Sequence, residues 1–115
     1  VTTGKFISSR PDITRRVVKS IVEGAALVRK EPAIAKRALS ARLHIKDGRE
    51  LEETYQLLNG FTRPKLYPSL DGFRAILSSL TNRMPVAKTA DPKDFSEPRL
   101  IEELDQSGYI DSLYK

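Results

Sequence analysis

The chain has 115 residues with no Cys, no Trp, one His and one Met, and its 20 Lys and Arg outnumber its 15 Asp and Glu. This length suits one domain, and the lack of Cys excludes disulfides, thiolate metal sites and cysteine nucleophiles. No apolar run approaches the roughly 20 residues that a membrane span needs, so we expect no membrane span. The sequence contains no signal-peptide pattern, and its start at Val1 suggests a trimmed chain or a piece of a longer protein.

The positive charge is concentrated in the first half of the chain. Residues 1–48 carry 11 Lys/Arg and 4 Asp/Glu, whereas residues 49–115 carry 9 and 11. Such a basic half is typical of a surface that meets nucleic acid or an acidic partner, and equally of a solvated basic face. Aromatic residues are not interleaved with the basic ones, and no Asn or Gln accompanies Lys36, Arg37 and Arg42 on their predicted helix as a recognition helix would require. A nucleic-acid function therefore rests on charge alone.

Helical patterns dominate the chain after Val1-Thr2-Thr3, which is β-prone and predicts the end of a strand. Pro11 suits the first position of a helix that continues to Lys30, and its apolar residues predict a single stripe at helical spacing: Ile13, Val17, Val18, Ile21, Val22, Ala25 and Val28. A second helix is predicted from Pro32 to about His44. A third is predicted from about Arg49 to Asn59, with Gly60 as its stop. Their short connections indicate that these three helices are neighbours.

Two more helices are predicted in the second half. Ser69 caps a helix that carries Leu70 to Leu80, and Ser96 caps another that ends at Gly108. Asp91-Pro92 begins a short turn that ends at Phe95, and residues 109–114 form a short terminal segment of one helical turn. The predicted fold class is therefore mainly α: a compact bundle of about five helices after a short N-terminal strand end. It forms a single helical domain over residues 1–115.

The sequence is poor in residues arranged for catalysis or metal binding. His44 lies alone at a helix end, where a favourable helix dipole explains it. Two acidic clusters occur at Glu50, Glu52, Glu53 and at Glu102, Glu103, Asp105, but neighbouring carboxylates on a helix point to different faces. The six Gly are scattered and form no phosphate-binding loop. We predict no enzyme activity, no cofactor, and no catalytic, cofactor-binding or metal-ligating residue; ligand-binding residues stay unassigned.

The order of four motifs along the chain resembles that of a known protein family. A helix entry at Lys5-Phe6 to Arg10-Pro11 leads into the long helix to Lys30 with Glu23-Gly24 inside it. Three further segments follow: Tyr67-Pro68-Ser69-Leu70-Asp71-Gly72, Lys88-Thr89-Ala90-Asp91-Pro92-Lys93-Asp94-Phe95, and Glu103-Leu104-Asp105-Gln106-Ser107-Gly108-Tyr109-Ile110-Asp111-Ser112-Leu113-Tyr114. In this order the chain resembles, over nearly its whole length, the C-terminal third of substrate-binding proteins of nitrate/sulfonate/taurine-type ABC importers (the NitT/TauT class, related to the thiamine-pyrimidine-synthase-like family).

The resemblance implies a two-lobed periplasmic binding protein that delivers a small solute to a membrane permease. This chain would then be its C-terminal fragment and would supply the helical part of lobe one. The short strand end would pair in a sheet that the chain itself lacks, and most of the ligand cleft would lie outside these residues. A periplasmic or extracytoplasmic location is implied in the same way.

Two alternatives stay open beside this interpretation. The chain could be a free-standing helical interaction domain derived by truncation, or a basic nucleic-acid-binding domain. If the chain is instead a segment cut from a larger lobe, the apolar stripe of the first helix and the strand end lose their partners. We therefore expect the chain on its own to self-associate, most simply as a two-fold dimer.

Overall fold

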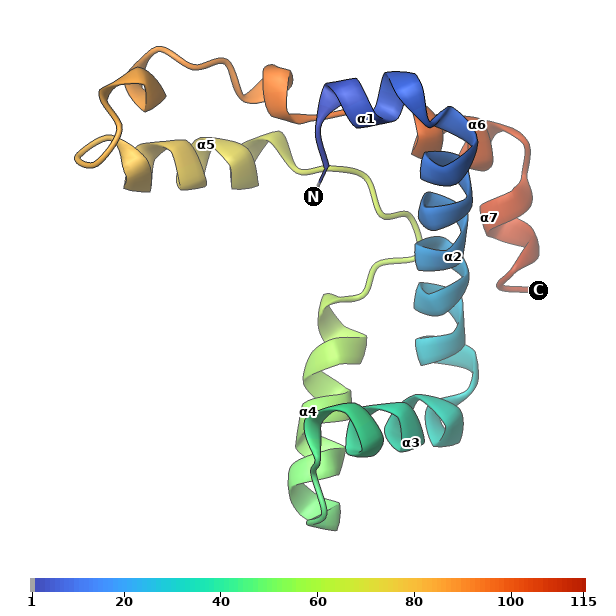
Figure 1. Cartoon of the computed structure of the whole chain (residues 1–115). Coiled ribbons are helices and arrows are strands. Elements are labelled where there is room, and N and C mark those ends of the chain that lie inside the picture. Colours follow the sequence, from blue (N-terminus) through green and yellow to red (C-terminus); the bar gives the residue numbers. More distant parts are fainter. Residues whose placement is uncertain (1) are drawn as a thin grey trace.

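The computed structural model describes residues 2–115, and it confirms a mainly helical domain (Figure 1). The described residues form seven α-helices and two short 3₁₀ helices: α1 (Gly4–Ser9), α2 (Pro11–Lys30), α3 (Pro32–Leu43), α4 (Gly48–Phe61), α5 (Leu70–Leu80), η1 (Pro85–Lys88), η2 (Pro92–Phe95), α6 (Arg99–Gln106) and α7 (Tyr109–Ser112).

The N-terminal end differs from its prediction. Val1 lies outside the described residues, and Thr2 and Thr3 belong to no strand. Thr3 is instead the N-cap of α1, where its hydroxyl accepts a hydrogen bond from the Phe6 backbone N–H at 3.2 Å. The β-propensity of Thr gives way here because the side chain satisfies a free N–H at a helix start. The prediction of a strand end at residues 2–3 is therefore wrong.

The next three helices agree with their predictions in number and order. Pro11 and Pro32 open α2 and α3, and α2 packs against α3 and α4 as the short connections indicate. Gly60, however, is a residue of α4 rather than its stop, since the helix continues to Phe61 and is capped at Thr62. The Thr62 backbone N–H and its hydroxyl both bond to the Leu58 carbonyl, at 2.9 and 2.7 Å, so the C-terminal turn closes without a glycine.

The last helices confirm one predicted cap and correct another. Ser69 caps α5 by accepting from the Gly72 N–H at 3.1 Å. Ser96 follows η2 and does not cap α6, which begins at Arg99 after Pro98. Gly108 separates α6 from α7 with a φ of +73°, a left-handed conformation that suits glycine.

The core is small and joins the two ends of the chain. Val22 of α2 and Ile110 of α7 are both fully buried, and Ile101 of α6 packs with them. Val18, Leu66, Leu104, Leu113 and Tyr114 surround this cluster. A second contact joins the C-terminal end of α2 to α4. The buried Tyr55 of α4 donates a hydrogen bond from its hydroxyl to the Val28 carbonyl at 3.0 Å.

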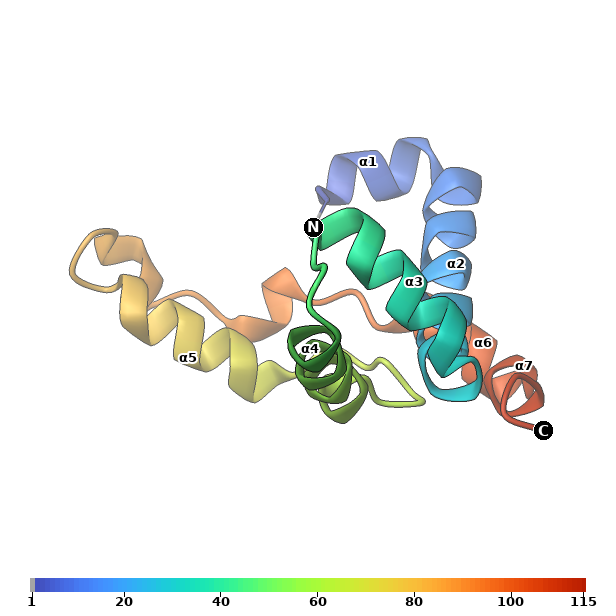
Figure 2. The same ribbon diagram turned by 90° about the horizontal axis from the view of Figure 1, so that it is seen from below.

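Residues 68–98, which we call the arm, project from this body. The arm contains α5, η1 and η2, and α5 packs chiefly against those two short helices. Figures 1 and 2 show it extending away from α2, α3 and α4 in both views. Its helix α5 has no buried residue, so the arm adds little to the core.

Replacement of Ile110 by Ala tests the assignment of the core. The side chain is fully buried, so the substitution should lower the free energy of unfolding by about 2–5 kcal/mol. Ile76→Ala is the control, because Ile76 is 55% exposed on α5 and its loss should cost less than about 0.5 kcal/mol. Urea unfolding followed by circular dichroism measures both. Equal effects of the two substitutions would contradict the position of the core.

Candidate functional site

The residues that the sequence analysis considers for catalysis or metal binding lie apart from one another in the fold. His44 ends α3 in the left-handed conformation, with a φ of 56°, and is exposed. Within residues 2–115 no group of three or more His, Asp or Glu side chains is arranged to hold a metal ion. His44 therefore takes the helix-terminal place that the sequence predicts.

The acidic residues of α4 serve the local structure. Glu52 pairs with Lys36 of α3 and accepts a hydrogen bond from Gln56 at 2.8 Å. Glu53 accepts instead from Arg49 at 3.0 Å, one turn earlier in the same helix. Neighbouring carboxylates thus engage different partners, as the helical geometry predicts. The Lys36 and Gln56 hydrogen bonds hold the pKa of the Glu52 carboxyl below its ordinary value of 4.5.

The acidic residues of α6 tie that helix to other parts of the chain. Glu103 accepts from Arg15 of α2 at 3.4 Å. Asp105 accepts from Lys65 at 2.6 Å and from the Tyr67 hydroxyl at 2.7 Å. These contacts join α6 to α2 and to the segment before α5, and their role in the fold is to hold elements together.

Several cations of the basic first half are engaged within the protein. The Arg29 guanidinium donates to the Thr62 carbonyl at 3.1 and 2.8 Å. The Lys19 ammonium lies 4.7 Å from the centre of the Tyr109 ring, and Lys36 lies 5.0 Å from that of Tyr55. With the Arg15 and Lys36 ion pairs, these contacts engage four of the 11 Lys and Arg of residues 1–48 within the protein.

The clearest candidate for a functional surface is an apolar stripe of α2, which we call the α2 face. Ile13, Val17 and Ile21 recur every four residues and are 45%, 52% and 55% exposed. The sequence predicts one stripe for all seven apolar residues of this helix. The structure divides it: Val22 and Ala25 are buried in the body, whereas the side chains of the α2 face remain about half exposed. Periodicity finds apolar residues, but which of them are covered depends on where other helices pack.

The α2 face continues into an open groove between α2 and α4. The groove has a volume of about 300 Å³. Ile21, Val28, Leu58 and Phe61 line it together with Gly24, Ala25, Thr62 and Leu66. Phe61 is 79% exposed and Leu57 of the same helix 61%. Large side chains exposed together in this way mark a surface that binds another apolar surface.

Comparison of the chain with family models, curated proteins and solved structures found no match. No helix that the structure describes combines the length and the apolar composition needed to span a membrane. The most prominent exposed apolar feature of the described residues is the α2 face with its adjoining groove.

The Glu52 ion pair gives a pH-dependent prediction. Because its pKa is lowered in the folded protein, the carboxylate stabilises the fold above its ordinary titration range, and this contribution is lost as the pH falls through the lowered pKa. Glu52→Gln should therefore reduce the drop in unfolding free energy between about pH 6 and about pH 3. Denaturant unfolding at a series of pH values measures the drop. Glu50→Gln, at an exposed position of the same helix, is the control, and an equal effect of both variants would contradict the pairing.

Proposed function

We propose that this chain is the C-terminal part of a solute-binding protein that serves an ABC importer, and that it carries out no catalysis itself. The order of motifs from the helix entry at Lys5-Phe6 to the terminal Tyr109-Ile110-Asp111-Ser112-Leu113-Tyr114 is the observation that carries the proposal. The partners of the complete protein would be a small solute and a membrane permease, and its location periplasmic or extracytoplasmic.

The roles of the motif residues support the proposal. Tyr67 and Asp105 bond to each other across 38 positions of the sequence, Ser69 and Asp91 cap short helices, and Gly108 makes the left-handed turn before α7. Because these residues stabilise the fold, proteins with the same order of motifs need not bind the same ligand. The ligand cleft would then lie chiefly outside these residues.

The exposed apolar surface of the α2 face also supports this proposal. Three large apolar side chains in a row on one helix are costly to leave in water, at roughly 25 cal/mol for each Å² of apolar surface. A segment of a larger lobe would have this face covered by the rest of that lobe. The exposed face is therefore explained if the chain is a part of a larger protein, although a second copy of the chain would cover it too.

The complete coding sequence provides the test of this function. We expect the reading frame to continue upstream of Val1 into a signal peptide and two lobes. The encoded protein should bind a small solute, for which nitrate, taurine and an aminopyrimidine are the probes in isothermal titration calorimetry. A reading frame that begins immediately before Val1 would contradict the proposal.

A free-standing interaction domain is the second candidate function, and the exposed α2 face favours it. On this alternative the chain by itself covers its apolar surface by self-association, most simply as a two-fold dimer. Nucleic-acid binding receives less support, because Arg15, Arg29 and Lys36 bond within the protein.

Light scattering over a wide range of concentration tests self-association of the isolated chain. We expect a dimer that Val17→Asp converts to a monomer, because the substitution places a charge at the centre of the α2 face. Ala33→Asp, at an exposed position of α3, is the control and should leave the dimer intact. A monomer at all concentrations would rule out this alternative.

A further inference from the structure

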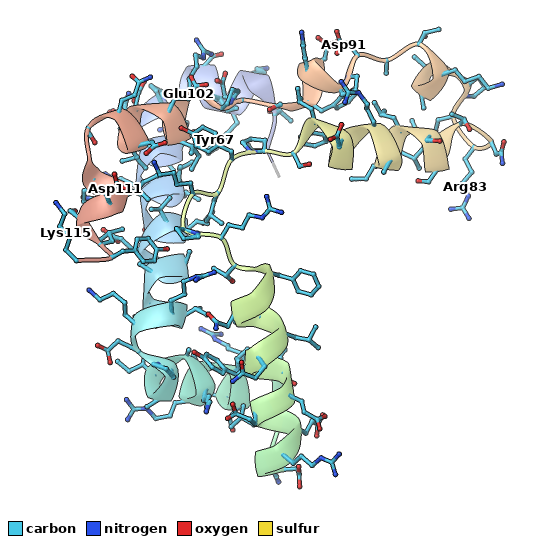
Figure 3. All side chains as sticks on the ribbon, turned by 180° about the vertical axis from the view of Figure 1, so that it is seen from behind. Tyr67, Arg83, Asp91, Glu102, Asp111 and Lys115 are labelled. Atoms are coloured by element: carbon cyan, nitrogen blue, oxygen red, sulfur yellow. The ribbon has the colours of Figure 1, made fainter. Side chains whose placement is uncertain are left out.

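The arm is joined to the body by two short segments. The first is residues 62–67, between α4 and the arm, and the second is the stretch around Pro98 that leads into α6. Since α5 packs chiefly against η1 and η2, its own contacts do little to set the direction of the arm. Figure 3 shows the arm as a separate limb, with Arg83 at its far end and Tyr67 at its base. The direction must then be set at the two connecting segments.

The first segment is held to the body at consecutive residues. Leu66 packs against the core cluster of Val22, Ile101 and Ile110. On either side of it, Lys65 and Tyr67 donate to the two different oxygens of Asp105, at 2.6 and 2.7 Å. Asp105 is the more shielded partner, with its side chain only 18% exposed. One carboxylate on α6 thus holds both residues next to the apolar anchor.

Tyr67 has a special place in this arrangement because it immediately precedes the arm. Leu66 fixes the position of the segment, but a single packed side chain leaves the following backbone free to turn. The Tyr67–Asp105 hydrogen bond removes that freedom. We refer to Lys65, Tyr67 and Asp105 together as the clasp.

Among the described residues, the bonds of the second segment are local. Glu97, at the end of the arm, pairs with Arg99, the first residue of α6, and its carboxylate also accepts from the Arg99 backbone N–H at 3.2 Å. These bonds join residues only two positions apart, so they stiffen the entry into α6 without reaching a more distant part of the body. The clasp is therefore the long-range polar contact at the base of the arm.

We propose that the clasp sets the direction of the arm, and that loss of the Asp105 bonds lets residues 68–98 turn as one unit about the two connecting segments. A partner that binds the arm and turns it must break these bonds. The orientation of residues 68–98 then depends on the Asp105 carboxylate.

The charges around the clasp keep it closed near neutral pH. Asp105 bonds to Lys65 and Tyr67, and an Asp111 carboxylate oxygen of α7 lies 3.8 Å from the Lys65 ammonium. Glu102 adds negative charge near Tyr67, as Figure 3 shows. The Lys65 and Tyr67 hydrogen bonds lower the pKa of Asp105, and the bond to Asp105 raises the pKa of Lys65. Protonation of Asp105 therefore opens the clasp only below the ordinary range of an aspartate.

The experiment measures the angle of the arm as a distance. The chain has no Cys, so Asn82→Cys near the far end of the arm and Arg37→Cys on α3 introduce two labelling sites at exposed positions. Double electron–electron resonance between spin labels there should give a single narrow distance distribution. We expect Tyr67→Phe, which removes the bond that follows Leu66 and keeps every charge, to broaden it. We expect Asp105→Asn, which replaces the charged acceptor of both clasp bonds by a neutral amide, to broaden it as well.

Glu103→Gln is the matched control. It neutralises a carboxylate on the same helix, but Glu103 pairs with Arg15 of α2 rather than with the clasp, so the distribution should stay narrow. Far-UV circular dichroism checks that each variant keeps its helices. A folded Asp105→Asn variant with the narrow distribution of the parent would overturn the proposal. Equal broadening by Glu103→Gln, or a distribution already broad in the parent, would overturn it too.

Discussion

The packing of α2 against α6 and α7 is the interaction on which the rest of the structure depends. Val22 and Ile110 are the largest fully buried side chains among the described residues, and they come from α2 and the C-terminal helix α7. Ile101 completes the cluster, and the Arg15–Glu103 and Tyr109–Glu23 contacts border it with polar bonds between the same elements. Without this contact α2 would lose the support of the C-terminal helices, and the segment that carries Leu66 would lose its anchor.

A core this small leaves much apolar surface without cover. Burial of apolar surface is the main favourable term in folding, yet here the α2 face, Leu57 and Phe61 remain in water. The arm shows the same pattern, with Val86 67% exposed and no buried residue in α5. Both proposals would cover these regions with another surface. The solute-binding proposal supplies that cover from the rest of one protein, whereas the interaction-domain alternative supplies it from a second copy.

Local sequence signals predicted most of the helices because local chemistry decides them. Pro11, Pro32 and Ser69 mark helix starts through backbone geometry and capping, which need no tertiary information. The errors occur where a competing local bond wins. Thr3 caps a helix that its β-propensity argues against, and Gly60 stays inside α4 because Thr62 closes that helix. The failed Ser96 cap has a similar origin, since Pro98 and Glu97 form the entry to α6.

The candidate surface was only partly predictable. Periodicity identified the apolar residues of α2 but could not divide them into covered and uncovered sets, because that division depends on helices about 80 residues away in the chain. The Tyr67–Asp105 bond had no local signal for the same reason. The charge counts of the two halves of the chain predict a basic surface. The bonds of Arg15, Arg29 and Lys36 show that part of this charge is engaged within the protein.

The most direct test of the central claim is the reactivity of a thiol placed on the α2 face. Val17→Cys would be the only thiol in this chain, and its alkylation rate can be measured in the isolated chain and in the protein made from the complete coding sequence. To follow the same thiol there, any cysteines of the added sequence are first replaced by Ser. If the chain is part of a larger binding protein, alkylation should be much slower in the complete protein, because the rest of the lobe covers this face. Equally fast alkylation in both proteins would contradict the account.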